Sequence, residues 1–275
     1  MSTAPPPAPP QQPGPTGVMH SLWQIEERLR RIERALRRFS LFRILDQIEK
    51  LGVLIAAGLY VFTCHDRTVE RHFEAWQVIN SAEAGGGDGG RIDALERLNR
   101  DGVSLARVGL ASAVLTRINL NGAHLSGAVL DGAVLDSSSL RRANLSNATA
   151  RTATFNQSDL REAVLTAANL SGAKMVAATL DHVYASGTDF SHATLRRASL
   201  TDATLDGAKF TGADVSEADL NLATLTNADF TGATLSSVRN WRAVRAMSGA
   251  RITGIKGAPP GFVEFAVSMG ALPPY

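Results

Sequence analysis

The segment GAHLSGAVLDGAVL, residues 122–135, repeats with a period of five. Its leucines are Leu125, Leu130 and Leu135, and an alanine stands two residues before each of them. An α-helix repeats about every 3.6 residues and a strand every 2, so neither element explains the pattern. The segment therefore predicts a structure whose building block is five residues long.

The same period extends over residues 103–239, about half of the chain. Every fifth residue from Leu105 to Leu235 is apolar and mostly large, and the run breaks at Asn240. A small residue, usually alanine, precedes each by two positions, and the other three positions hold mainly Ser, Thr, Asn, Asp, Gly and Arg. Such an array predicts a solenoid, in which each unit buries its apolar side by stacking on its neighbours.

The units ANLSN (143–147), ADVSE (213–217), ADLNL (218–222) and ADFTG (228–232) resemble those of pentapeptide-repeat proteins. The resemblance covers residues 103–239. It implies an all-β solenoid, a right-handed quadrilateral β-helix with four pentads per coil and with the large and small apolar residues pointing inward.

Four pentads make 20 residues, so residues 20 apart are expected to stack about 4.8 Å apart, the strand spacing of a sheet. One inward column then holds only leucines, and another holds three phenylalanines whose stacking favours the register. These inner structural residues are Leu120, Leu140, Leu160, Leu180, Leu200 and Leu220, and Phe190, Phe210 and Phe230.

The outward columns place opposite charges 20 residues apart. The expected pairs are Asp131 with Arg151, Arg142 with Glu162, and Arg197 with Glu217, while Asp189, Lys209 and Asp229 alternate in one column. Solvated pairs contribute about 0 to 1 kcal/mol each. They support the register more than the stability.

Both ends of the array need a cover, because open strand edges invite aggregation. Before it, residues 92–101 predict a cap helix with Asp93 at its N-cap and Leu95 and Leu98 on its apolar side. After it, residues 240–275 predict a helical cap, in which a final helix ends at Gly270. The cap residues expected on one face of that helix are Phe262, Phe265 and Met269.

The first 91 residues divide by composition. Residues 1–19 are rich in proline and predict a disordered tail, and residues 20–80 predict amphipathic and apolar helices with heptad spacing. Residues 81–91 predict a glycine-rich linker, which lacks the pattern of a phosphate-binding loop. The helices are thus an extension of the solenoid domain.

The apolar stretch at 51–64 has three interpretations. Fourteen residues of helix span about 21 Å, less than the hydrocarbon core of about 30 Å, but Lys50 and Arg67 could extend the span by snorkelling. The arginine-rich flank before it favours a membrane anchor with the N-terminus inside. The alternatives are a stalk that joins copies of the chain as a soluble, cytoplasmic oligomer, and a helix packed on the solenoid.

Nothing in the sequence supplies a catalytic cluster or a cofactor site. The single Cys64 excludes an intramolecular disulfide and a multi-cysteine zinc site. The histidines His124, His182 and His192 are expected on three different walls, so they cannot converge on a metal. We therefore expect no enzyme activity, no cofactor and no metal.

Charge also limits the partners. Pentapeptide-repeat rods that resemble DNA are acidic, whereas residues 103–239 hold 12 acidic and 11 basic residues, and a duplex mimic needs a strong negative field. A local acidic strip at Asp202, Asp206, Asp214, Glu217 and Asp219 keeps inhibition of a type II topoisomerase as an alternative. The absence of a DNA-reading motif argues against nucleic acid as a partner.

The sequence therefore predicts a non-enzymatic module for protein interaction, tethered by its N-terminal helices to a membrane or to copies of itself. A lipid bilayer, a homo-oligomer through the N-terminal helix and an unidentified protein are the expected partners. Membrane association through one short anchor is the expected location.

Overall fold

The computed structural model describes residues 26–33, 68–81 and 90–274. The chain separates into two units, residues 1–69 and 70–275, which are treated individually. In the first unit, residues 26–33 are helical and carry an ion pair of 2.6 Å between Arg30 and Glu26. Leu29 and Ile32 are exposed on this helix.

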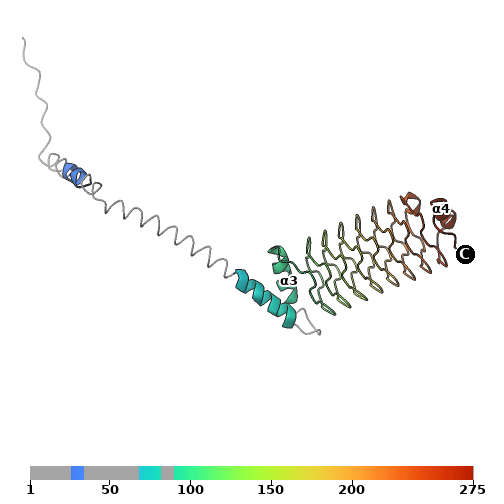
Figure 1. Ribbon diagram of the computed structural model, residues 1–275, viewed down its shortest axis with the longest axis horizontal. Helices are drawn as coiled ribbons and strands as arrows, with labels where there is room; N and C mark the ends of the chain where they lie inside the picture. Colours follow the sequence, from blue (N-terminus) through green and yellow to red (C-terminus); the bar gives the residue numbers. More distant parts are fainter. Residues whose placement is uncertain (1–25, 34–67, 82–89, 275) are drawn as a thin grey trace, which may run out of the picture. The chain divides into compact units, whose positions relative to one another are not determined.

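The second unit is a solenoid whose coils contain four pentads (Figure 1). Parallel bridges join residues 20 apart, from the pair Gly109 and Val129 to the pair Asp219 and Arg239. Each side of a coil contributes one bridging residue, so the chain forms isolated bridges rather than long strands. The expected β-solenoid is confirmed.

Each corner of a coil is a tight turn. In the turn after Leu110, the Ala113 amide donates to the Leu110 carbonyl at 3.1 Å, and Ser112 has φ of 56°. Every fifth residue from Arg107 to Ser237 has such a positive φ, and only eight of these are glycine. Since a side chain in the left-handed region costs roughly 1–2 kcal/mol, hydrogen bonds and core packing must hold these corners.

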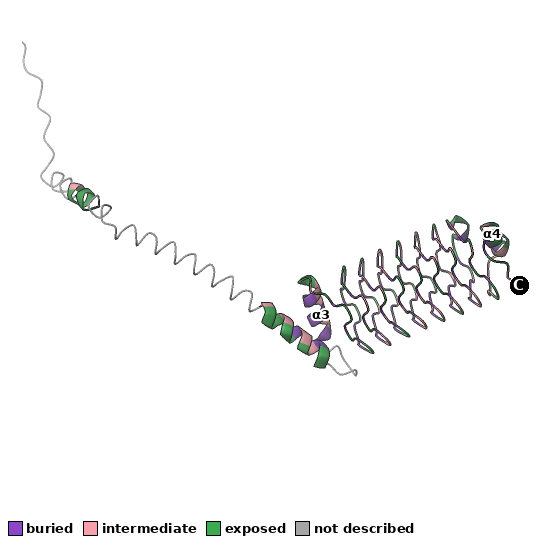
Figure 2. Cartoon of the chain, viewed as in Figure 1, coloured by how far each residue is buried: buried purple, intermediate pink, exposed green. Residues whose placement is uncertain are grey.

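The core is the interior of the coils, where leucine, phenylalanine and alanine residues are buried. Figure 2 shows buried residues alternating with more exposed ones along each coil. Three phenylalanines form a stack, with ring centroids 5.1 Å apart for Phe190 and Phe210 and 4.7 Å apart for Phe210 and Phe230. All three are at most 1% exposed, as are the six leucines from Leu120 to Leu220. Stacked aromatic side chains thus fill one column of the interior.

Helix α3 (Arg91–Arg100) covers the first coil. Leu95 and Leu98 are fully buried, and Glu96 accepts a hydrogen bond of 2.8 Å from the Asn119 amide. The expected N-cap at Asp93 is wrong, because the helix begins after Gly90, whose φ of 77° makes the turn, and Asp93 lies in the first helical turn.

The helix over residues 68–81 adds a second element at this end. Ala75 and Ile79 belong to the same buried core as α3 and the coils. The His72 ring lies 2.8 Å from the Asp101 carboxylate, which follows α3. This helix therefore packs on the N-terminal end of the solenoid.

At the other end the coils continue beyond residue 239. Bridges join Thr224 to Ala246, Asp229 to Arg251 and Thr234 to Lys256, a spacing of 22. The 3₁₀ helix η1 (Trp241–Ala243) lies in this extra length. The expectation that residues 240–275 form only a helical cap is therefore wrong, since an insertion of two residues displaces the period without ending the coil.

Helix α4 (Phe262–Ser268) follows this last coil. Phe262 is 1% exposed, and its ring meets that of Trp241 edge to face with centroids 5.5 Å apart. Phe265 contacts the same indole at 5.3 Å, and Met269 packs on the core just after the helix. These aromatic contacts attach α4 to the C-terminal end of the solenoid.

The proline-rich tail 1–19 and the apolar stretch 51–64, with Cys64, lie outside the described residues. Among the residues that are described, no helix has the length and apolar character needed to cross a bilayer.

Candidate interaction surface

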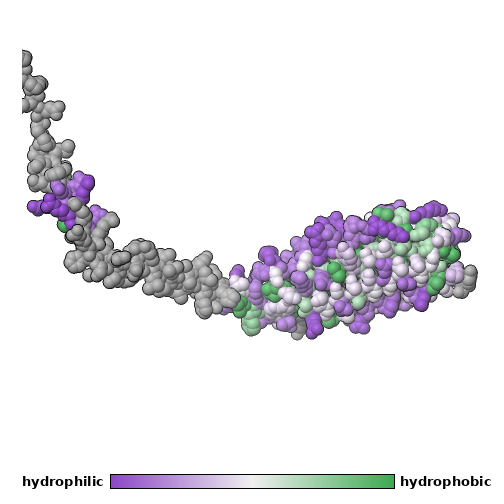
Figure 3. Space-filling model, turned by 45° about the horizontal axis from the view of Figure 1, so that its top comes forward, coloured by the Kyte–Doolittle hydropathy of each residue, from purple (hydrophilic) through white to green (hydrophobic). Residues whose placement is uncertain are grey.

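The outward residues of the coils form flat walls separated by corners. We call the bridging residues 119, 139, 159, 179, 199, 219 and 239 the polar wall. We call the adjoining corner residues 141, 142, 161, 162, 181, 182, 201 and 202 the charged corner. The face shown in Figure 3 is mainly polar, with apolar residues in small separate areas.

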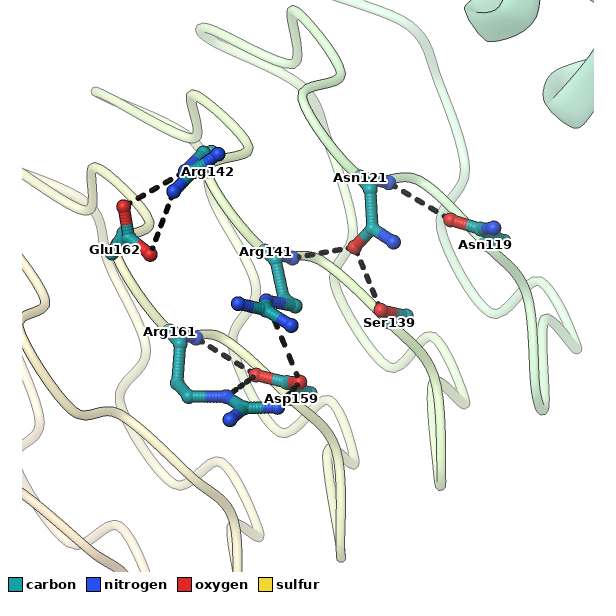
Figure 4. Close-up of polar contacts among 8 residues, drawn as sticks. All are labelled: Asn119, Asn121, Ser139, Arg141, Arg142, Asp159, Arg161 and Glu162. Atoms are coloured by element: carbon teal, nitrogen blue, oxygen red, sulfur yellow. Dashed lines mark hydrogen bonds and ion pairs between the residues drawn. The ribbon is translucent and has the colours of Figure 1, made fainter.

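The polar wall and the charged corner are linked by hydrogen bonds between coils (Figure 4). The Asn121 side-chain oxygen accepts from the Ser139 hydroxyl at 2.7 Å and from the Arg141 amide at 2.9 Å. On a later coil, Arg161 donates to Asp159 at 2.8 Å through Nε, and these hydrogen bonds lower the pKa of the Asp159 carboxyl. These hydrogen bonds thus orient the Asn121, Asp159 and Arg161 side chains.

Ion pairs also run along the columns as the sequence predicts. Arg142 donates to Glu162 at 2.8 Å, Arg151 approaches Asp131 to 2.6 Å, and Arg197 donates to Glu217 at 2.7 Å. The hydrogen bonds from these arginines lower the pKa of Asp131, Glu162 and Glu217. Lys209 is placed by its bridges to Asp189 and Asp229 in the alternating column.

One role of the Asp and Asn residues was missed from the sequence. In eight pentads an Asp or Asn before the large apolar residue accepts a hydrogen bond from the amide two positions later, as Asn169 does from Ser171 at 3.0 Å. Six other turn amides donate instead to a corner side chain 20 residues earlier, as Asn156 does to Asp136. The A(D/N)L pattern itself was the signal, since a turn amide needs an acceptor.

The expected acidic strip does not exist as one surface. Asp202, Asp206, Asp214, Glu217 and Asp219 occupy different corners and walls around the coil. Asp202 binds both His182 and Arg245, and Glu217 binds Arg197. Arginine neighbours thus compensate much of this charge.

The three histidines of the array also occupy different positions around the coil. His124 is a bridging residue, whereas His182 and His192 lie at two separate corners. Over the ranges 26–33, 68–81 and 90–274, no three His, Cys, Asp or Glu residues are grouped to hold a metal ion.

The comparisons agree with this fold. Residues 113–149, 143–181, 173–212 and 205–239 match the family model for pentapeptide repeats, in eight copies. The chain therefore belongs to the pentapeptide-repeat proteins. These are in general structural or interaction modules.

Solved structures of the same family are similar to this chain. HetL, a pentapeptide repeat protein involved in heterocyst differentiation regulation from the cyanobacterium Nostoc sp. strain PCC 7120, is 24% identical, with 66% of this chain and 96% of HetL covered and a TM-score of 0.42. Full-length QnrB1, a plasmid-mediated fluoroquinolone resistance protein, is 15% identical, with 58% and 88% covered and a TM-score of 0.31. The comparison with curated proteins gave no match.

Proposed function

We propose that this protein is a non-catalytic interaction module, in which the polar wall binds a protein and the N-terminal extension attaches the solenoid to a membrane. The observation that carries the proposal is the fixed geometry of the polar wall. Its side chains repeat every 20 residues and are held by hydrogen bonds such as that from Arg161 to Asp159. A surface that is ordered before binding loses less conformational entropy when a partner docks.

The chemistry of the polar wall indicates the kind of partner. It offers hydroxyl, amide, carboxylate and guanidinium groups, and Arg239 at its end is 57% exposed on its side chain. A protein surface with mixed polar groups matches this set better than a phosphate backbone does, because a phosphate array requires a mainly basic surface.

Capture from cell extract followed by mass spectrometry tests the polar wall. We expect proteins retained by the full-length chain to be lost with Ser139→Arg and Ser199→Arg together. The matched control carries Thr149→Arg and Thr194→Arg, which lie on other walls. Equal retention by all three proteins would refute binding through the polar wall.

Membrane attachment is tested separately by fractionation with a carbonate wash. The proposal requires the full chain to resist the wash and a version that begins near Gly90 to be released. If the full chain is released as well, the membrane part of the proposal fails while the binding part stands.

Inhibition of a type II topoisomerase by DNA mimicry is the alternative of a different class. The pairing of Asp202 with Arg245 and of Glu217 with Arg197 argues against it, since both carboxylates are compensated. A supercoiling assay at micromolar protein decides the matter, and inhibition there would favour the alternative.

A further inference from the structure

One wall of the solenoid carries no Asp, Glu, Lys or Arg. We call its bridging residues 124, 144, 164, 184, 204 and 224 the uncharged wall. Tyr184, near its centre, is 55% exposed, whereas the four phenylalanines of residues 103–239 are buried. Depletion of charge around an exposed tyrosine is typical of the core of a protein interface.

The charged corner borders this wall, and its charges are ordered along the coils. Arg141 and Arg142 come first, Arg161 and Glu162 second, Asp181 and His182 third, and Asp202 fourth. Within one chain Arg142 pairs with Glu162, and Asp202 pairs with His182 and Arg245. The formal charge of the corner residues themselves changes from basic to acidic over four coils. A surface with such a gradient complements its own reversed copy.

We propose that two copies of this chain pair face to face and antiparallel through their uncharged walls. The twofold axis lies in the interface, perpendicular to the solenoid axis, and passes between Val164 and Tyr184. Val164 and Tyr184 are bridge partners on adjacent coils. The axis therefore places Tyr184 against Val164 of the second copy, and Val164 against Tyr184 of the second copy, as an isologous interface requires.

The same axis matches the charges of the corner. Arg161 faces Asp181 of the second copy, and Glu162 faces its His182. One coil further out, Arg142 faces Asp202 of the second copy. Each of these contacts occurs twice because the interface is isologous.

Other arrangements lose this complementarity. Moving the axis half a coil in one direction places Asp181 against Asp181, and in the other direction Arg161 against Arg161. Like charges placed against each other across an interface are unfavourable. In a parallel pair the charged corner faces the opposite corner of the wall, where Ser186 and Gly187 offer no opposite charge.

The size of the wall suits a specific dimer. The wall and its two corners provide five outward positions per coil, which over five coils is roughly 25 residues, within the 20–30 per partner of a standard interface. The second corner holds small residues, among them Thr166, Ala167 and Gly207, so it permits close approach. Its acidic residue, Asp206, accepts a hydrogen bond from the Thr226 amide at 3.0 Å, as Asp181 of the charged corner does from the Thr201 amide at 3.2 Å.

Disulfide cross-linking in the full-length chain tests the pairing, with Cys64→Ser removing the native thiol. Asn144→Cys and Thr204→Cys stand three coils apart in one chain, about 14 Å at the spacing of a sheet. This exceeds the reach of a disulfide, so a bond between 144 and 204 must join two chains. We expect oxidation to give a covalent dimer in which peptide mapping finds that bond.

The matched control is Thr149→Cys with Lys209→Cys, which have the same offset on another wall. We expect its dimer yield to be at least tenfold lower. Equal yields from both walls, or bonds only between 144 and 144, would overturn the proposal.

Charge exchange provides a second readout of the axis. Arg161→Asp or Asp181→Arg alone should lower the yield of the 144–204 dimer at least tenfold, and the two together should restore it. Circular dichroism confirms that each variant is folded. Folded single variants that cross-link as well as the parent, or a folded double variant that does not recover, would contradict the proposed pairing.

Discussion

Replacing Phe210 by alanine should destabilise the solenoid. The loss should be larger than for an alanine substitution at any other inward residue of the phenylalanine column. The ring is fully buried between Phe190 at 5.1 Å and Phe230 at 4.7 Å, so the change removes both stacking contacts and leaves a cavity. Truncation of a buried phenylalanine costs about 3–5 kcal/mol, and each aromatic pair contributes about 0.5–1.5 kcal/mol beyond its area. We therefore expect Phe210→Ala to lower the free energy of unfolding by about 5 kcal/mol, the upper end of this range.

Urea unfolding followed by far-UV circular dichroism measures this loss. Leu205→Ala is the control, because Leu205 is equally buried but takes part in no aromatic stack, and we expect it to cost about 3 kcal/mol. Phe210→Leu keeps much of the volume and should cost about 1.5 kcal/mol. If Phe210→Ala costs no more than Leu205→Ala, the stacked column does not contribute as described.

Three further predictions concern the core, the turns and the charges. Leu160→Asp buries an unpaired charge and should unfold several coils, whereas Thr201→Ala should be nearly silent; equal loss of circular dichroism signal would contradict the register. Asn169→Ala removes the acceptor of a turn amide and should cost about 1 kcal/mol in thermal unfolding, while Asn169→Asp should retain it. Arg151 lowers the pKa of Asp131, so their pair stabilises the fold above the ordinary carboxyl pKa of about 4 and is lost as pH falls through the lowered value. The stability of Asp131→Asn should then fall less than that of the parent between neutral and acid pH.

Much of the coil follows from the period of five alone. Once the pentads are read in fours, the inward leucines, the phenylalanine stack and the Asp131–Arg151 pair all follow, because parallel bridging repeats the same geometry 20 residues on. The register is therefore fixed by simple counting. This holds because each pentad meets only its neighbours.

Features that break the period were not predictable in the same way. Trp241 begins a 3₁₀ turn that adds two residues, so counting in fives stops there although Met247 and Ile252 lie buried in the next coil. The start of α3 at Arg91 depends on the conformation of Gly90, which composition does not reveal. The pairing of Asp202 with Arg245 links residues 43 apart and depends on that shifted coil.

The candidate site was less predictable than the fold. Composition placed the polar residues on the outside of the coils. It did not show which of them form a wall that could bind a partner. The distinction between the polar wall and the uncharged wall around Tyr184 appears only when columns are compared around the coil. The proposed pairing depends on the order of charges along one corner. The total charge of the array does not reveal this order.

The most direct test of four pentads per coil is a through-hydrogen-bond coupling measured by NMR between an amide nitrogen and a carbonyl carbon. The Leu180 amide donates to the Ser199 carbonyl at 2.7 Å, and the Ser199 amide donates to the Ala178 carbonyl at 3.0 Å. The account predicts couplings for both pairs, and the same offsets along residues 110–219. Couplings from the Leu180 and Ser199 amides to carbonyls about 15 residues away, as in a three-sided coil, would contradict it.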